Sequence, residues 1–200
     1  MLYYERKFKK LGFDTIIGVD EAGRGPLAGP VVAAAVLLKK ARFINRIDDS
    51  KKLTALAREH AFQEISKNSL FGIGIIDEKI IDRVNILQAT VMAMEEAINS
   101  LIRRISSARC RRAYVIVDGN LKLNIAFPYR SIIGGDGKSK SIAAASILAK
   151  VTRDRIMEAY HKLYPQYGFA KHKGYPTSEH RALLRRLGPS EIHRKSFSYA

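Results

Sequence analysis

Five short apolar runs, rich in β-branched residues, most constrain what this chain can fold into. Each is four to eight residues long, as expected for strands of a sheet that is covered on both faces. Longer segments with helical periodicity lie between and after them. Strands that come first and then alternate with helices predict an α/β fold with a mixed sheet. The expected strands are Thr15–Asp20, Val31–Leu38, Phe71–Asp77, Ala113–Asp118 and Arg130–Ile133.

Four segments have the periodicity of helices. The clearest is Ile81–Leu101, where apolar residues recur at steps of three and four and therefore lie on one face. Those residues are Val84, Leu87, Val91, Met94 and Ile98. The other helices are expected over Thr54–Asn68, Ser141–Leu163 and Thr177–Leu187.

The connection between the first two strands limits how they can pair. It is rich in glycine and too short for a crossover helix, so Thr15–Asp20 and Val31–Leu38 are expected to be antiparallel neighbours. The chain has no internal repeat, low-complexity tract or linker rich in Pro and Ser, and its six prolines are scattered. We therefore expect a single domain over residues 1–200.

The charge of the chain points to an anionic partner. Its 35 Lys and Arg residues exceed its 19 Asp and Glu residues, giving a formal net charge of +16. A compact domain this basic repels itself unless an anion offsets the charge, and nucleic acid is the commonest such partner. Charge alone does not distinguish a nucleic-acid substrate from a nucleic acid that is only bound.

Composition excludes several other classes of protein. With 46% hydrophobic and 27% charged residues, the chain is neither disordered nor fibrous. Its single cysteine, Cys110, cannot form an intrachain disulfide. The longest apolar run, Pro30–Leu38, is far shorter than the roughly 20 residues that span a membrane, and the N-terminal residues do not resemble a signal peptide. We expect a cytoplasmic protein that binds no membrane.

Carboxylates stand at the ends of three predicted strands. One strand runs into Asp20 and Glu21, another into Asp118 and a third into Asp136. A single aspartate in such a place usually caps a turn, but four carboxylates that converge on one place would repel one another. A divalent cation would relieve that repulsion, and hard oxygen ligands suit Mg²⁺ or Mn²⁺ better than Zn²⁺. The alternative is pairing with Lys or Arg.

Adjacent carboxylates on a strand pose a geometric problem, because successive side chains point to opposite faces. Asp20 and Glu21 reach one site only if the strand bends or ends there. The residues that follow, Gly23, Arg24 and Gly25, permit such a bend and allow close approach of a ligand to the backbone.

These segments together resemble the type 2 ribonucleases H, the bacterial ribonuclease HII family. The similarity is ordered along the chain and covers Gly18 to about Ser196. Its most extended block follows Gly135 and Asp136. The matching segments are Ile17–Val31 (IGVDEAGRGPLAGPV), Asp49–Leu53 (DSKKL), Val117–Gly119 (VDG), Ser141–Arg155 and Lys171–Tyr175 (KHKGY).

The resemblance implies a ribonuclease H-like fold, with a central mixed five-stranded sheet flanked by helices and a helical C-terminal part. It also implies metal-dependent hydrolysis of RNA in RNA–DNA hybrids, 5′ of a ribonucleotide, including a single ribonucleotide embedded in duplex DNA. The metal-binding and catalytic residues would be Asp20, Glu21, Asp118 and Asp136, with Mg²⁺ or Mn²⁺ as cofactor. The segment Gly23–Gly25 and Tyr175 would sense the 2′-hydroxyl and the RNA-to-DNA junction.

Further nucleic-acid contacts are expected from Ser50, Lys51 and Lys173. The five histidines are interpreted as structural or surface residues, although His172, in a basic segment, could bind phosphate. We expect the protein to act as a monomer. Two alternatives remain open: an RNA-binding protein without catalysis, and a nuclease of the same fold, such as a junction resolvase, that cuts DNA without ribonucleotides.

Overall fold

A mixed sheet of five strands forms the centre of the computed structural model, which describes residues 1–199 apart from the side chains at positions 107 and 109. Its order is β3-β2-β1-β4-β5. Strand β1 pairs antiparallel with β2 and parallel with β4, so the predicted antiparallel neighbours are confirmed. The strands are β1 Thr15–Ala22, β2 Val31–Leu38, β3 Ser69–Ile76, β4 Ala113–Asp118 and β5 Tyr129–Ile132.

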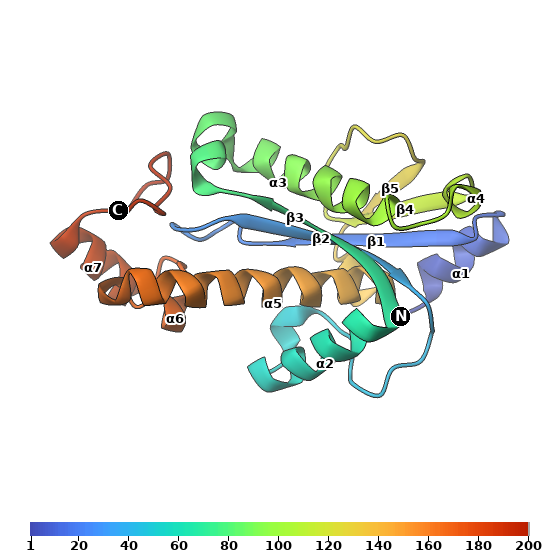
Figure 1. Ribbon diagram of the computed structural model, residues 1–200, viewed down its shortest axis with the longest axis horizontal. Coiled ribbons are helices and arrows are strands. Elements are labelled where there is room, and N and C mark those ends of the chain that lie inside the picture. Colours follow the sequence, from blue (N-terminus) through green and yellow to red (C-terminus); the bar gives the residue numbers. More distant parts are fainter. Residues whose placement is uncertain (200) are drawn as a thin grey trace.

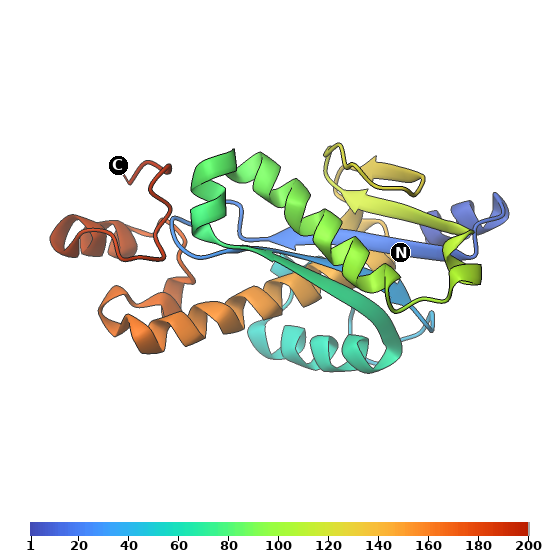
Figure 2. The ribbon, with the colours of Figure 1, turned by 45° about the horizontal axis from the view of Figure 1, so that its top comes forward.

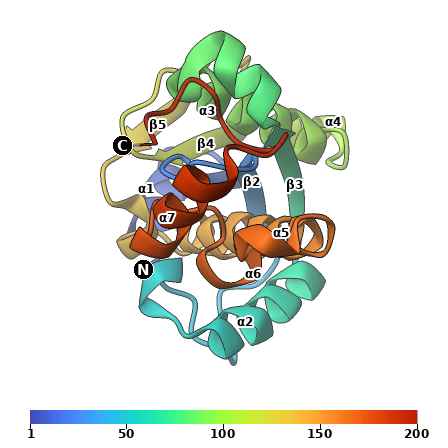
Figure 3. The same cartoon turned by 90° about the vertical axis from the view of Figure 1, so that its left-hand side faces the viewer.

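Helices cover both faces of the sheet (Figure 1). Helix α3 (Glu78–Ile102) crosses one face, as the tilted view in Figure 2 also shows. Helix α5 (Lys140–Leu163) lies along the other face, and α2 (Ala55–Asn68) packs against α5 on its far side (Figure 3). The α/β class with a covered mixed sheet is therefore confirmed.

Small residues bring α5 close to the sheet. A Cβ on Gly18 of β1 would lie 2.2 Å from the backbone carbon of Ser141, so only glycine allows this approach. The start of α5 is rich in alanine because it is buried, and Ala143, Ala144 and Ala145 are fully inaccessible to solvent. This contact fixes the direction of β1, the strand that ends in the acidic pair.

Threonine side chains cap the first turns of two of the predicted helices. Helix α2 begins after Thr54, whose side chain accepts a hydrogen bond from the backbone N–H of Ala57. Helix α7 (Ser178–Leu187) begins after Thr177 in the same way and ends at Gly188. Two strands differ from their predicted bounds by one or two residues at each end, and Asp77, expected in a strand, is instead the N-cap of α3.

Helix α3 contains a break that the periodicity did not reveal. Asn85 adopts φ 69° and ψ 166°, and its side-chain oxygen accepts hydrogen bonds from the backbone N–H groups of Leu87 and Gln88. Asn85 thus caps a second helical segment in a new register. The prediction that Leu87 lies on the buried face is wrong, because Leu87 is 53% exposed.

Helix α1 (Tyr3–Lys10) is not among the predicted helices. It buries few side chains, and its Phe8 ring stacks on Tyr114 at 3.9 Å between centroids. It is also held by Glu5, which accepts hydrogen bonds from Ser139 and Ser141 near the start of α5. These hydrogen bonds join residues 134 to 136 positions apart, so nothing in the local sequence of α1 indicates them.

The C-terminal part is helical, as predicted, and lies beyond the end of β1 (Figure 1). It comprises the short helices η3 (Pro165–Tyr167) and α6 (Phe169–His172), followed by α7. A separate apolar cluster includes Phe169, Tyr167 and Leu184 and reaches Leu27 of the segment between β1 and β2. Across the described residues, we find no helix with the length and hydropathy that crossing a membrane requires.

Candidate metal and nucleic-acid site

Three of the four predicted carboxylates lie together at one edge of the sheet. Strands β1 and β4 are parallel, so Asp20 and Asp118 emerge at the same end, and Asp136 follows β5 in the helical turn η2 (Gly135–Gly137). Each of these three residues offers an oxygen, and the three oxygens lie within 4.8 Å of one another. The prediction that strand ends bring carboxylates together is confirmed for this acidic triad, Asp20, Asp118 and Asp136.

Backbone N–H groups orient the triad. Asp118 accepts a hydrogen bond of 2.6 Å from Gly135, which follows a left-handed turn at Gly134 with φ 63°. A Cβ at Gly135 would lie 2.7 Å from the terminal methyl group of Ile142 and 3.3 Å from the Asp118 carboxylate, so glycine is the residue that fits here without moving either side chain. Asp136 accepts from Gly137 at 2.8 Å. The Gly-Gly-Asp-Gly segment therefore holds two carboxylates in place.

Burial and mutual repulsion destabilise the charged form of these carboxylates. The pKa of Asp20 is raised well above its usual value, first by burial and then by the neighbouring charges of Glu21 and Asp118. The pKa of Asp136 is raised by burial and then by Asp118 and Asp49. A divalent cation would reverse both effects, because it favours the deprotonated form.

Glu21 lies beside the triad and does not belong to it. Strand β1 continues through Glu21 to Ala22, so the expected bend or end of the strand does not occur at this pair. The Glu21 carboxylate lines the same cleft and lies 3.4 Å from the guanidinium of Arg24. Burial raises the pKa of Glu21, and Arg24 opposes that rise.

The cleft beside the triad has a volume of about 540 Å³ and is lined by three of the predicted carboxylates, Asp20, Glu21 and Asp118. Asp136 belongs to the triad but is not among the residues that line this cleft. The cleft brings together segments that are far apart in the sequence: the end of β1, the turn η1 (Ser50–Lys52), helix α5 and the loop before α7. Of the predicted nucleic-acid contacts, those that line it are Gly23, Arg24, Gly25, Ser50, Lys51 and Tyr175.

Lys173 is not among the residues that line the cleft. Its ammonium donates to Glu158 at 2.9 Å and to the carbonyl of Ala170 at 2.7 Å. His172 is 7% exposed, and its Nε2 bonds to the carbonyl of Tyr167 at 2.7 Å, consistent with a structural role. The role of Lys173 in binding therefore stays a prediction.

Two residues of α5, Ser146 and Lys150, line the cleft and were not predicted. The hydroxyl of Ser146 donates to Ser50 at 3.0 Å, and Lys150 lies 5.6 Å from the centre of the Tyr175 ring. They are four positions apart and so share one face of the helix. Two signals in the sequence could have identified them: this spacing, and their position in the segment Ser141–Arg155 that resembles the ribonuclease HII family.

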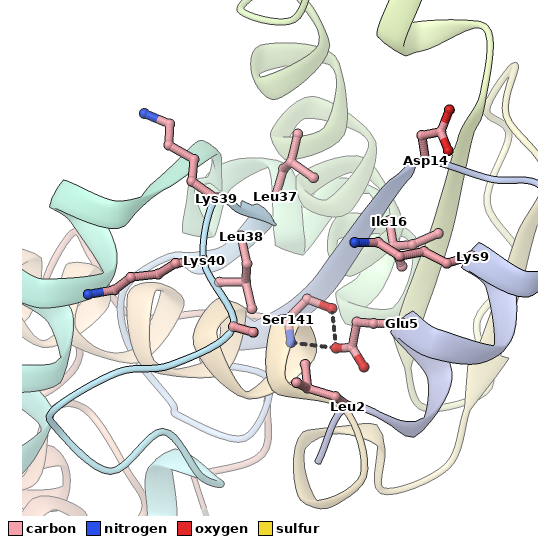
Figure 4. Close-up of a pocket in the computed structure, with 11 residues that line it drawn as sticks. Leu2, Glu5, Lys9, Asp14, Ile16, Leu37, Leu38, Lys39, Lys40 and Ser141 are labelled. Atoms are coloured by element: carbon pink, nitrogen blue, oxygen red, sulfur yellow. Dashed lines mark hydrogen bonds between the residues drawn. The ribbon is translucent and has the colours of Figure 1, made fainter.

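A second hollow, of about 140 Å³, lies near the start of β1 (Figure 4). Glu5 extends from α1 to its wall and accepts hydrogen bonds from the N–H and hydroxyl of Ser141. The described residues that line it include none of the predicted site residues. This hollow is the seam between α1 and α5, not part of the acidic site.

Comparisons with known proteins agree with the geometry. The family model for ribonuclease HII matches residues 17–200. Ribonuclease HII of Caldanaerobacter subterraneus subsp. tengcongensis is 51% identical over 198 residues, covering 98% of this chain and 79% of the relative. The crystal structure of ribonuclease H2 from Pyrococcus horikoshii OT3 aligns with a TM-score of 0.73 and 26% identity, covering 92% of this chain and 94% of that one.

Similarity of fold extends further than similarity of sequence. The crystal structure of Bst-RNase HIII in complex with Mn²⁺ aligns with a TM-score of 0.78 at 19% identity, covering 96% of this chain and 70% of that one. The ribonuclease H-like fold is therefore shown. On the match over nearly its whole length and on its identity to named relatives, this chain belongs to the ribonuclease HII family.

Proposed function

We propose that this chain is an endoribonuclease that hydrolyses the RNA strand of RNA–DNA hybrids and cuts 5′ of a ribonucleotide, including a single ribonucleotide embedded in duplex DNA. Membership of the ribonuclease HII family supports the activity on hybrids. The observation that carries the proposal is that Asp20, Glu21 and Asp118 share one cleft with Gly23–Gly25 and Tyr175. Asp136 offers a further oxygen to the same acidic triad. The carboxylates proposed to bind the catalytic metal and the residues proposed to detect the 2′-hydroxyl could therefore contact the same substrate.

The acidic triad fits Mg²⁺ or Mn²⁺. Its ligand atoms are carboxylate oxygens, the donors that these hard cations prefer, and they are already close together. The Mn²⁺ complex of Bst-RNase HIII, which has the same fold, supports this choice of ion. A bound cation would neutralise charge on the scissile phosphate and acidify the attacking water. We propose that Glu21, which borders the triad, completes the acidic set.

The chain's own residues can bind and orient the backbone of the substrate. Lys51, Lys150 and Arg24 line the cleft and would attract phosphates on either side of the triad. Tyr175, 37% exposed, offers a ring face on which a sugar can lie. A Cβ on Gly25 would lie 4.0 Å from Tyr175 Cε1, its nearest neighbour, so Gly25 and this ring lie next to each other in the cleft and can contact the same nucleotide.

Each of these groups comes from one chain, which supports action as a single domain and as a monomer. Hybrids and ribonucleotide-containing DNA are the proposed partners, and the cytoplasm is the proposed location. The net charge of +16 supports binding to nucleic acid but does not select among nucleic acids.

One assay tests the proposal. A DNA duplex with one ribonucleotide, a matched all-DNA duplex and a long RNA–DNA hybrid are incubated with Mg²⁺, with Mn²⁺ or with chelator, and the cut sites are mapped. We expect metal-dependent cutting 5′ of the ribonucleotide and no cutting of the all-DNA duplex. Cutting of all-DNA substrates would favour a resolvase-like nuclease, and binding of the hybrid without metal-dependent cutting would favour a binding protein.

A further inference from the structure

Three histidines of the C-terminal part form a buried cluster outside the cleft. His172, His180 and His193 are at most 7% exposed. The rings of His172 and His180 stack at 4.2 Å between centroids, and His180 Nε2 lies 3.0 Å from His193 Nε2. None of the three lines the cleft, so the proposed chemistry does not use them directly.

The hydrogen bonds of the cluster select one set of neutral tautomers. His180 Nδ1 lies 2.9 Å from the carbonyl of Tyr175 and must donate to it. Its Nε2 then accepts from Nε2 of His193, whose Nδ1 accepts from the backbone N–H of Ser190 at 2.9 Å. A continuous chain of donors and acceptors thus runs from Ser190 to the backbone of Tyr175.

The neighbouring residue, Arg194, contacts the other side of the cleft. Its guanidinium is fully buried and donates to the carbonyls of Gly23 at 2.6 Å and Arg24 at 3.1 Å. Two consecutive residues, His193 and Arg194, are therefore linked by hydrogen bonds to Tyr175 and to the segment Gly23–Gly25.

We propose that His193, through His180, is a positioning residue that sets the distance between Tyr175 and Gly23–Gly25, and so the discrimination of a single ribonucleotide. This inference rests on the proposed function, because it assumes that these two elements sense the sugar. His193 touches no substrate and acts only through the backbone of Tyr175. Arg194 anchors the opposite side of the same gap.

The surroundings of the cluster keep it neutral. Burial, and after it the neighbouring His180, lower the pKa of His193 to about 4. Burial also lowers the pKa of His172 and His180. The rings that face His193 are those of Tyr167, Phe169 and Tyr199. A neutral chain is required because a proton on His180 Nε2 would oppose the N–H of His193.

Three variants separate positioning from general stability. His193→Phe keeps an aromatic ring in the core and removes both nitrogens. His193→Gln keeps a side-chain N–H that can reach His180 Nε2. Tyr167→Phe is the matched control, because it removes a hydrogen bond of 2.8 Å to Gly188 from the same cluster and touches neither side of the cleft.

The readout is the ratio of two cleavage rates, on a duplex with one embedded ribonucleotide and on a long hybrid. We expect His193→Phe to lower this ratio about tenfold, as when a positioning group shifts by a fraction of an ångström. His193→Gln should restore most of it, and Tyr167→Phe should leave it unchanged even if the protein melts earlier. In a Tyr175→Ala background, His193→Phe should have no further effect.

The outcomes separate the two proposals. If Tyr175→Ala leaves the ratio unchanged, the sensor role of Tyr175 is wrong and the positioning role falls with it. If Tyr175→Ala lowers the ratio but His193→Phe does not, or lowers it equally in the Tyr175→Ala background, only the positioning role is wrong. Ring ¹⁵N spectra of the wild-type protein give an independent reading: His180 protonated at Nε2 would overturn the inference, and protonation at Nδ1 supports it.

Discussion

The guanidinium of Arg194 donates a hydrogen bond of 2.6 Å to the carbonyl of Gly23, although the two residues are 171 positions apart. Gly23 has φ +102°, and a Cβ there would lie 2.3 Å from Nε of Arg153. Both arginines are fully buried and donate only to backbone carbonyls in this region. The path of the glycine-rich segment is therefore set by two cations beneath it as well as by its own flexibility.

Replacing Arg194 should destabilise the protein. Arg194→Lys keeps the charge, but one ammonium cannot replace the bonds to Gly23, Arg24, Pro26 and Gly29. Each buried carbonyl left without a partner costs roughly 1–3 kcal/mol, so we expect a loss of about 3 kcal/mol or more in the free energy of unfolding. Urea unfolding measures it, with the exposed Arg185→Lys as control. Equal stability of the two variants would contradict this account.

The acidic triad predicts a loss of cleavage without a loss of binding. Asp118→Asn removes one negative charge from the proposed metal site and leaves the shape almost unchanged. Loss of groups that merely support metal ligands costs about 10–100-fold, so loss of a ligand should lower the cleavage rate by more than about 100-fold. Affinity for the hybrid, measured without cutting in Ca²⁺ or chelator, should change little because phosphate contacts dominate it.

A control for that variant is available at the other end of β1. Asp14→Asn removes an exposed carboxylate that pairs with Arg112 at 3.1 Å, far from the triad along the strand. It should cut at the wild-type rate. An Asp118→Asn protein that cuts a hybrid as fast as Asp14→Asn does would rule out the assignment of the triad as the metal site.

Metal should stabilise the folded protein. Because the pKa of Asp20 is raised, the folded state binds a proton more tightly than the unfolded state, so stability without metal falls as the pH rises through the carboxyl range. Mn²⁺ at about 100 times its dissociation constant should add about 2.7 kcal/mol at neutral pH. Asp20→Asn should remove most of that gain and raise the Tm of the metal-free protein. Melting curves with and without Mn²⁺ measure these effects. A wild-type Tm that does not change on addition of Mn²⁺ would contradict the assignment of the metal site.

The strand-end carboxylates could be predicted because their placement follows from local sequence. Asp118 is the last residue of the buried strand β4, so its carboxylate lies at the end of the sheet. Asp136 lies four residues beyond β5, and the short glycine-rich turn between them brings it to the same place. Glu21 shows where that reasoning stops. Strand β1 continues through Glu21, so the side chains of Asp20 and Glu21 point to opposite faces of the sheet. The pairing of Glu21 with Arg24 depends on the path of the following loop.

The structural role predicted for the histidines holds for His172, His180 and His193, which are buried and hydrogen-bonded. The partners of these histidines and of the buried arginines could not be predicted, because they depend on the tertiary fold. Arg153 and Arg194 look like the many surface cations of a basic chain, yet all but one of their carbonyl partners lie 123 to 171 positions away, and the exception, Lys173, lies 20 positions from Arg153. Lys173 does not line the cleft for a related reason, because its ammonium donates a hydrogen bond to Glu158 of α5 instead. Sequence patterns report which residue types are present and do not report which tertiary partner each finds.

The histidine cluster predicts acid sensitivity. In the folded protein the pKa of His193 is lowered to about 4 from an ordinary value of 6.5, so below pH 6.5 the unfolded state binds more protons. Stability contributed by neutral His193 is full above about pH 6.5 and is lost as the pH falls toward 4. His193→Gln should flatten this part of the curve of unfolding free energy against pH. The titration of Asp20 has the opposite slope and is common to both proteins, so it cancels in their difference. A difference in unfolding free energy between wild type and His193→Gln that stays constant from pH 6.5 to 4 would count against a buried neutral histidine.

The last prediction concerns Gly25 and Tyr175, which are neighbours in the lining of the cleft. A Cβ at Gly25 has as its nearest neighbour Tyr175 Cε1 at 4.0 Å, so Gly25→Ala should fold normally, whereas Gly23→Ala should not. In the complex that methyl group would occupy space that the ribose needs. We therefore expect Gly25→Ala to slow cutting at a single embedded ribonucleotide while its Tm stays near the wild-type value.

Tyr175 completes the same test from the opposite side. Tyr175→Phe should cost about 0.5–1.5 kcal/mol in transition-state stabilisation if its hydroxyl bonds the 2′-hydroxyl of the substrate. Tyr175→Ala should cost more, because packing of the ring on the sugar is lost as well. Both losses should be larger on a single ribonucleotide than on a long hybrid, where the enzyme can sample many registers. Rates on the two substrates measure this, and if Tyr175→Ala lowers both rates by the same factor, Tyr175 binds nucleic acid without sensing the junction.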